Sequence, residues 1–152
     1  MQVGGRSGRH DLPGEVLIQT EHPGHPLYRA LAEHDYAAFA RAQLDERRAA
    51  GFPPFSFQAL LSAEAPDIGD ALAFLAQARA AAAPRADAQV SLYDPVPMRL
   101  FRLKNRERAQ LLVESTSRPA LQALLAAWSE RLRALKAPRD LRWHLDVDPL
   151  EF

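Results

Sequence analysis

Between residues 52 and 152, stretches with two different spacings of apolar residues follow one another, and the order of these stretches limits the folds that are open to this chain. Apolar residues at every second position are typical of a strand with one buried face, and apolar residues three or four positions apart are typical of an amphipathic helix. This order, β-α-β-β-α-β, predicts an α+β domain in which two helices cover one face of a four-stranded antiparallel sheet. The stretches are a strand at 55–64, a helix at 67–84, a strand at 90–104 interrupted at 94–97, a strand at 108–114, a helix at 117–135 and a strand at 142–148.

A domain boundary is predicted at the segment Gly51-Phe52-Pro53-Pro54. Glycine commonly follows the last turn of a helix, and two prolines in succession bar its continuation. We therefore expect a first part at 1–51 and a second part at 52–152. Within the first part, the short apolar run 15–20 predicts a strand buried on both faces, and 27–50 predicts a helix that breaks near His34.

Composition excludes several classes of function. The chain has no cysteine, which excludes disulfides, thiolate metal sites and a cysteine nucleophile. Acidic and basic residues number 19 each, so any nucleic-acid surface has to be local. No apolar run reaches the length of a membrane span and no signal-peptide pattern is present. We expect a cytoplasmic protein without a membrane partner and without a bound metal.

Two arginines near the start, Arg6 and Arg9, each directly follow a glycine. Glycine lets the backbone approach a ligand closely, and arginine is a bidentate ligand for phosphate. Together with Gln2 they form the pattern Gln-x-x-Gly-Arg-x-Gly-Arg, which suits the terminal phosphate of a nucleotide. The alternative is a solvated terminus without a ligand. The sequence contains no Gly-x-x-x-x-Gly-Lys-Ser/Thr phosphate loop, so ATP hydrolysis by this chain alone is not expected.

A basic cluster occupies the predicted hairpin at 99–108, opposed within that segment only by Glu107. Such a hairpin could follow a DNA backbone while its aromatic residue stacks on a base. The alternative is a solvated strand edge whose charges prevent pairing with another sheet. The candidate DNA-binding residues are Arg99, Phe101, Arg102, Lys104, Arg106 and Arg108.

Charged residues also flank the second long helix. Arg118 and Gln122 lie one turn apart at its start, where an arginine is also common as a solvated first-turn residue. Asp146 and Asp148 share one strand face. We expect these two carboxylates to pair with Arg142 or neighbouring basic residues and not to bind magnesium.

Several short motifs together resemble a known family. In chain order they are Gln2–Arg9, Pro13–Thr20, His25-Pro26-Leu27, Glu46-Arg47-Arg48, Pro53-Pro54, Pro95-Val96-Pro97 and Asp146-Val147-Asp148-Pro149. In this order they resemble the C-terminal end of the PriA family (primosomal protein N′), the replication-restart DNA helicases, over essentially the whole chain. The Gly-Arg pair alone is shared with many superfamily 2 helicases as motif VI, and the Asp-Val-Asp-Pro ending makes the resemblance specific. Gly4 and Ser7 depart from the family, which usually has alanine at both positions.

The resemblance implies a fold and roles for the first residues. It implies that 52–152 is a domain like ribosomal protein S10, with a ferredoxin-like order, and that 1–51 is a strand-and-helix remnant of a RecA-like helicase lobe. In the complete ATP-dependent 3′→5′ helicase, Gln2, Arg6 and Arg9 would face the γ-phosphate of ATP, with magnesium bound nearby. Neither ATP nor magnesium is expected on this chain alone, and the zinc-binding cysteines of the family are absent.

The resemblance also implies partners. DNA forks and single strands would contact the S10-like domain. Arg118 and Gln122 match family residues that contact the acidic C-terminal tail of single-stranded DNA-binding protein. Other primosome proteins are further expected partners.

Two hypotheses of function follow. In the first, the chain is the C-terminal part of a replication-restart helicase that binds DNA and partners and is inactive as a motor by itself. In the second, it is a stand-alone βαββαβ module associated with RNA or the ribosome that has kept a vestigial N-terminus. An adjacent upstream reading frame encoding the phosphate loop would distinguish the first from the second, and Met1 by itself does not.

Overall fold

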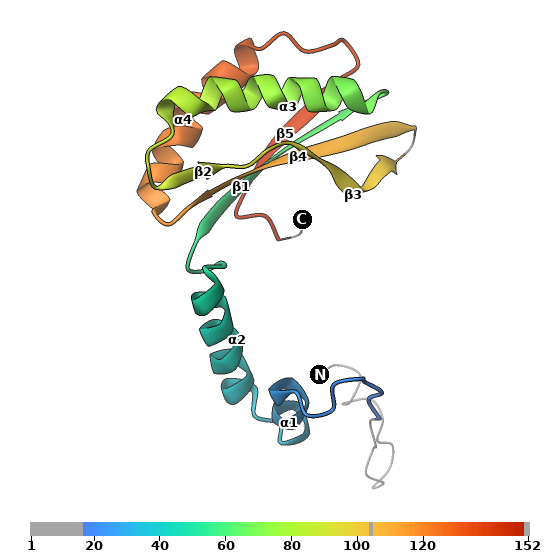
Figure 1. Ribbon diagram of the computed structural model, residues 1–152, viewed down its shortest axis with the longest axis vertical. Helices are drawn as coiled ribbons and strands as arrows, with labels where there is room; N and C mark the ends of the chain where they lie inside the picture. The colour runs from blue at the N-terminus through green and yellow to red at the C-terminus, as the bar shows by residue number, and fades with distance from the viewer. Residues whose placement is uncertain (1–16, 104, 151–152) are drawn as a thin grey trace, which may run out of the picture. The chain divides into compact units, whose positions relative to one another are not determined.

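The structure is a computed structural model that describes residues 17–103 and 105–150, with the backbone alone for residues 99–103 (Figure 1). The chain divides into two compact units, residues 1–45 and 46–152. Helix α2 (Tyr36–Ala50) runs across this division. The predicted boundary after Gly51 falls just beyond the end of that helix.

The first unit contains a helix break where the sequence predicts one. Helix α1 (Pro26–Ala32) ends before His34, whose φ of 54° is left-handed, and α2 begins at Tyr36. The strand predicted at 15–20 is wrong for its described part, because 17–20 has no regular structure and Leu17 is 86% exposed. A doubly buried strand needs parallel neighbours and layers on both faces, and the described residues place none beside it.

Helix α2 ends as its sequence predicts. Gly51 has a φ of 67°, a left-handed value that glycine adopts without strain. Its N–H donates to the carbonyl of Arg48, and the N–H of Phe52 donates to that of Arg47. This pair of bonds is the Schellman ending, which satisfies carbonyls that the helix would leave free.

The second unit is an α+β domain with the predicted order of elements. Its strands form one antiparallel sheet in the order β2-β4-β1-β5, with β3 also paired to β4. This is the arrangement of the split βαβ motif. The elements are β1 (Phe57–Ala65), α3 (Ile68–Ala82), a 3₁₀ turn η2 (Ala83–Arg85), β2 (Val90–Leu92), β3 (Val96–Leu103), β4 (Arg106–Ser115), α4 (Arg118–Ala134) and β5 (Arg142–Val147).

Five strands replace the predicted four because one edge strand is interrupted. Strands β2 and β3 pair with successive parts of β4. The interruption is shorter than the predicted 94–97, since β3 already begins at Val96 and Pro97 is opposite Ala109. Proline lacks the N–H that a central strand would use, and an edge strand tolerates this.

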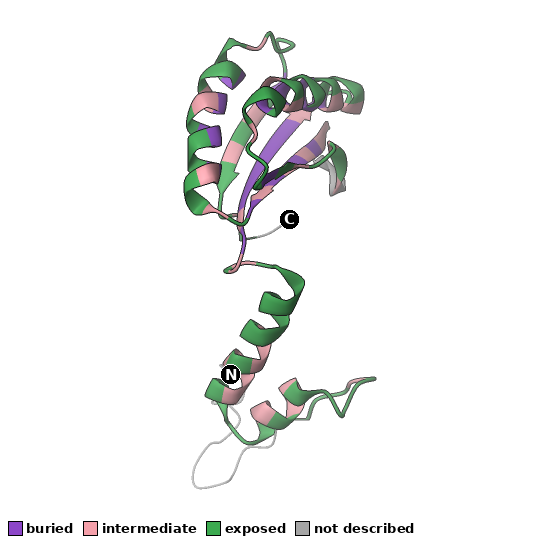
Figure 2. Cartoon of the chain, turned by 60° about the vertical axis from the view of Figure 1, so that its left-hand side comes forward, coloured by how far each residue is buried: buried purple, intermediate pink, exposed green. Residues whose placement is uncertain are grey.

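The core lies between the sheet and helices α3 and α4, which cover one face of it (Figure 1). Buried positions line the facing sides of helices and sheet (Figure 2). Leu61 of β1 lies between Leu111 and Leu145 in the strand register and is fully buried. Trp128 of α4 is also fully buried, and its indole N–H donates to the carbonyl of Ala78 at 2.8 Å. The opposite face, which we call the open face because neither α3 nor α4 covers it, carries most of the polar positions of the strands, with the paired Leu60 and Leu112 as apolar exceptions.

Candidate functional site

The open face of the sheet has a basic end. Glu64 of β1 lies opposite Arg108 of β4 on one side and opposite Arg142 of β5 on the other. Directly opposed residues of an antiparallel pair share a face, so this row reads Arg-Glu-Arg across three strands. Arg106 lies two residues before Arg108 on β4, so its side chain is on the same face, next to this row. Three arginines thus gather around one carboxylate at the end of the sheet where the β3–β4 hairpin lies.

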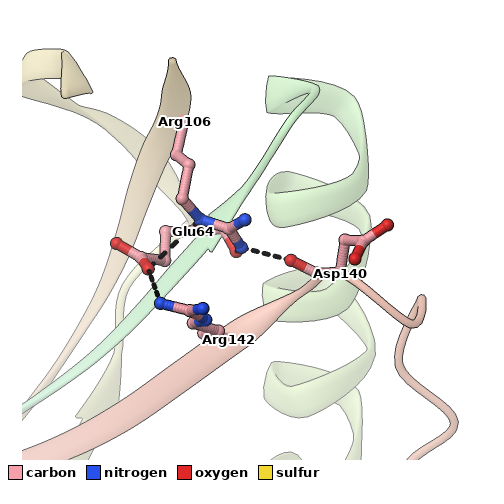
Figure 3. Close-up of polar contacts among 4 residues, drawn as sticks. All are labelled: Glu64, Arg106, Asp140 and Arg142. Atoms are coloured by element: carbon pink, nitrogen blue, oxygen red, sulfur yellow. Dashed lines mark hydrogen bonds and ion pairs between the residues drawn. The ribbon is translucent and has the colours of Figure 1, made fainter. Parts of the chain in front are cut away.

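Arg106 uses its guanidinium inside the domain (Figure 3). Its Nε is 3.2 Å from Glu64 Oε1, and its Nη2 donates to the carbonyl of Glu64 at 3.0 Å and to the carbonyl of Asp140. Only 21% of its side chain is exposed. Arg142 reaches the same Glu64 carboxylate at 3.9 Å but is 77% exposed. Arg106 therefore joins β4, β1 and the loop before β5, and Arg142 leaves most of its surface to solvent.

The predicted DNA-binding residues are only partly described. Arg99, Phe101 and Arg102 lie in β3 by their backbone, but their side chains lie outside the described residues, and so does all of Lys104. Arg108 is described and half-buried. Glu107, the acid within the hairpin, accepts a hydrogen bond from the N–H of Ile68 at 2.8 Å and so caps α3.

A second arginine site lies where three elements meet. Arg118 opens α4, Phe57 opens β1, and Asp148 directly follows β5. The guanidinium carbon of Arg118 lies 4.6 Å from the ring centroid of Phe57, and its Nη1 is 3.0 Å from Asp148 Oδ2. The side chains of Arg118 and Asp148 are 52% and 47% exposed. This site, which we call the Arg118 cluster, presents a positioned guanidinium to solvent.

Local capping holds the start of α4 in place. Ser117 is the N-cap and its Oγ accepts from the N–H of Ala120, while the N–H of Ser117 donates to Ser115 Oγ at 3.0 Å. Gln122 lies one turn after Arg118 on α4 and is exposed. The start of α4 also bears the positive end of the helix dipole, which favours an anion there. A carboxylate that approaches the start of α4 would meet both the Arg118 guanidinium and the positive end of the helix dipole.

Sequence reasoning proposed Arg118 and Gln122 as a partner site, which stays a prediction, and missed Phe57 as the ring beneath the guanidinium. It expected Asp148 to pair with a basic residue, and the partner is Arg118. It also missed Glu64 and Arg142 at the basic end. The alternation of apolar and polar residues along β1 and β5 places both side chains on the open face. Which residues lie opposite each other, however, depends on the strand register.

Glu114 organises the end of the open face away from the hairpin. Its carboxylate accepts hydrogen bonds from Ser56 Oγ at 2.8 Å, Gln58 Nε2 at 3.0 Å and Tyr93 Oη at 2.9 Å. Burial raises the pKa of Glu114, but these three hydrogen bonds together outweigh it and hold the pKa below the ordinary 4.5. The hydrogen bond to Glu114 and the negative charge of that carboxylate raise the pKa of Tyr93 above 10.0. With all three donors facing one carboxylate, this cluster stabilises the fold.

The nucleotide-facing residues predicted at the start, Gln2, Arg6 and Arg9, lie outside the described residues. Among the residues that the structure does describe, none of the helices has the length and apolar character needed to cross a bilayer.

The fold and its two arginine sites define a small α+β domain of the split βαβ class with two charged surfaces. Residues 48–150 match the family model described as Primosomal protein N C-terminal domain, and the chain belongs to this family.

Similarity to curated proteins extends over nearly the entire chain. A replication restart protein PriA from Haemophilus influenzae is 36% identical over 149 residues, which are 98% of this chain and 20% of that protein. Proteins of the same name from Synechocystis and Bacillus subtilis are 32% and 27% identical and cover 98% and 97% of this chain. These stretches are 17% and 18% of the two proteins, so the chain spans about a fifth of the length of these relatives.

Proposed function

We propose that this chain is the DNA- and partner-binding portion of a replication-restart helicase of the PriA type. The family match supports the assignment to that class, and the names of the relatives suggest the process. In the complete motor, Gln2, Arg6 and Arg9 would face the γ-phosphate of ATP and its magnesium ion, and other primosome proteins would bind alongside. The purified chain is expected to turn over no ATP, because arginines only complete a site that also needs a phosphate cradle, a lysine and a metal ligand.

The observation that carries the DNA-binding proposal is the basic end of the open face. Arg108 and Arg142 flank Glu64 on this face. Arg102 pairs with Glu107 in the strand register and so belongs to the opposite face, and Lys104 lies outside the described residues, so both stay predictions from the sequence. Arginine and lysine bind DNA chiefly by neutralising phosphates, which makes binding weak in sequence preference and strong in salt dependence. Because the net charge of the chain is zero, this local surface has to provide the attraction.

Fluorescence anisotropy with a labelled single-stranded oligonucleotide tests this surface. We expect replacement of Arg108 and Arg142 by alanine to reduce the slope of log K against log salt by about 0.7 for each phosphate that the variant no longer neutralises. Arg131→Ala with Arg133→Ala is the matched control, since both residues are exposed on α4, which covers the other face of the sheet. Equal slopes for this double variant and the wild type would show that the basic end does not contact DNA phosphates and would favour a solvated strand edge.

We also propose that the Arg118 cluster docks the acidic C-terminal tail of single-stranded DNA-binding protein. A guanidinium binds carboxylate through two parallel hydrogen bonds, and Phe57 beneath it limits its motion. Gln122, one turn further on, can bond the backbone or a second carboxylate. In the complete helicase the pocket would include further residues, so we expect this chain alone to bind at tens of micromolar or weaker, on the order of −6 kcal/mol.

Titration with a tail peptide tests the docking proposal. Arg118→Glu should abolish the spectral shifts, because it replaces the positive guanidinium with a charge of the peptide's own sign. Arg139→Glu is the control, as Arg139 is exposed in the loop before β5. Equal losses in the two variants would show general electrostatic attraction and would exclude a specific site.

A further inference from the structure

The guanidinium that is proposed to receive a partner's carboxylate already holds a carboxylate of its own chain. Arg118 Nη1 lies 3.0 Å from Asp148 Oδ2, and both side chains are about half exposed. Asp148 is held in place by its backbone, whose N–H donates to the carbonyl of Gln58 at 2.9 Å. Gln58 is the residue after Phe57, so the ring beneath Arg118 and the carboxylate beside it are both tied to the start of β1.

We infer that Asp148 is an internal competitor at the Arg118 cluster, so that an acidic partner segment has to displace it or bind against its negative charge. The inference rests on the proposed docking of an acidic tail. A carboxylate that binds Arg118 through two parallel bonds needs one whole edge of the guanidinium, and the edge bearing Nη1 is engaged by Asp148. A carboxylate at another edge would lie within a few ångströms of Asp148, where like charges repel.

The alternative, that Asp148 improves binding by orienting Arg118, is disfavoured by the ring contact. The ring centroid of Phe57 lies 4.6 Å from the guanidinium carbon, and capping by Ser117 places the start of α4. The guanidinium is thus positioned without Asp148. The exposed ion pair stabilises the folded chain only slightly, since such pairs raise the equilibrium constant for folding by at most about a factor of five.

Asparagine at position 148 is the variant that isolates the charge. Asp148 has a φ of 55°, a left-handed value that asparagine adopts more readily than most residues. The backbone hydrogen bond to Gln58 is kept, and the side chain keeps its size. Asp148→Asn should therefore remove the negative charge while preserving the fold, which a circular dichroism melt checks.

The experiment measures the affinity of the full 152-residue chain for a short synthetic peptide that has several aspartates and an apolar C-terminal residue with a free carboxylate. We expect Asp148→Asn to tighten binding about fivefold, which corresponds to about 1 kcal/mol. Asp146→Asn is the matched control, as it removes the same charge from an exposed residue two positions earlier on β5. It should change affinity by less than about twofold.

A double-mutant cycle completes the test. In an Arg118→Gln background, Asp148→Asn should bring no gain, because the competed group is absent. Unchanged or weaker binding by Asp148→Asn, while binding still depends on Arg118, would overturn the inference and leave the docking proposal standing. If no variant binds the peptide in an Arg118-dependent way, both the docking proposal and this inference fail.

Discussion

Arg106 and Arg118 are both arginines that open a secondary-structure element, and both were predicted to bind a partner, yet the domain uses them differently. Arg106 contacts a carboxylate and two backbone carbonyls and is 21% exposed. Arg118 contacts one carboxylate and one ring and is 52% exposed. A guanidinium whose donors face backbone carbonyls of its own domain has few left for a ligand. Residue type and position in sequence therefore do not show which arginine is engaged inside the domain and which is left accessible to a ligand, whereas the number of internal partners does.

The largest expected effect is on stability. Arg106→Ala should lower the free energy of unfolding by about 2 kcal/mol, because it leaves the half-buried Glu64 carboxylate and two carbonyls without this partner. Arg118→Ala should lower it by less than about 1 kcal/mol, as an exposed ion pair contributes little. Urea denaturation followed by tryptophan fluorescence measures both, since both tryptophans, Trp128 and Trp143, lie in the second unit. Equal reductions in the two variants would break the comparison.

A smaller effect concerns the ring under Arg118. Phe57→Leu keeps an apolar side chain but removes the cation–π contact, so we expect the affinity for the acidic peptide to fall about two- to fivefold, or about 0.5–1 kcal/mol. Phe55→Leu is a matched control, because Phe55 lies under the guanidinium of Arg48 at the same 4.6 Å and outside the Arg118 cluster. Weaker binding by both variants would trace the effect to general loosening near the start of β1.

The smallest expected effect is the pH dependence of the Glu114 cluster. The pKa of Glu114 is lowered in the folded state, so its contribution to stability is present above the ordinary value of 4.5 and is lost as the pH falls through the lowered pKa. Glu114→Gln should cost at most about 1 kcal/mol at neutral pH, and its difference from the wild type should shrink below pH 4.5. Denaturation curves over that range measure it. A difference that is constant with pH would show that the hydrogen bonds do not depend on the charge.

The helices and strands of residues 52–152 were predictable because their signals are local. Period two placed Ala59, Leu61 and Ala63 on one face of β1, and all three are buried. Asp67 and Ser117 were identified as starts of helices, and each side chain caps its helix. The prediction was wrong for 17–20, where an apolar run alone does not supply the neighbours that a buried strand requires.

The sequence by itself determined the order of elements in residues 52–152 and the face of each that meets the core. Through resemblance it also predicted a partner site at Arg118 and Gln122, which stays a prediction. Only the tertiary structure decided what each arginine contacts. Phe57, Arg118 and Asp148 are far apart in the chain and meet because β1 pairs with β5 while α4 begins beside them. Hydrophobic period specifies which way a side chain faces, but the pairing of charges depends on strand register and helix placement, which the packing of the core sets.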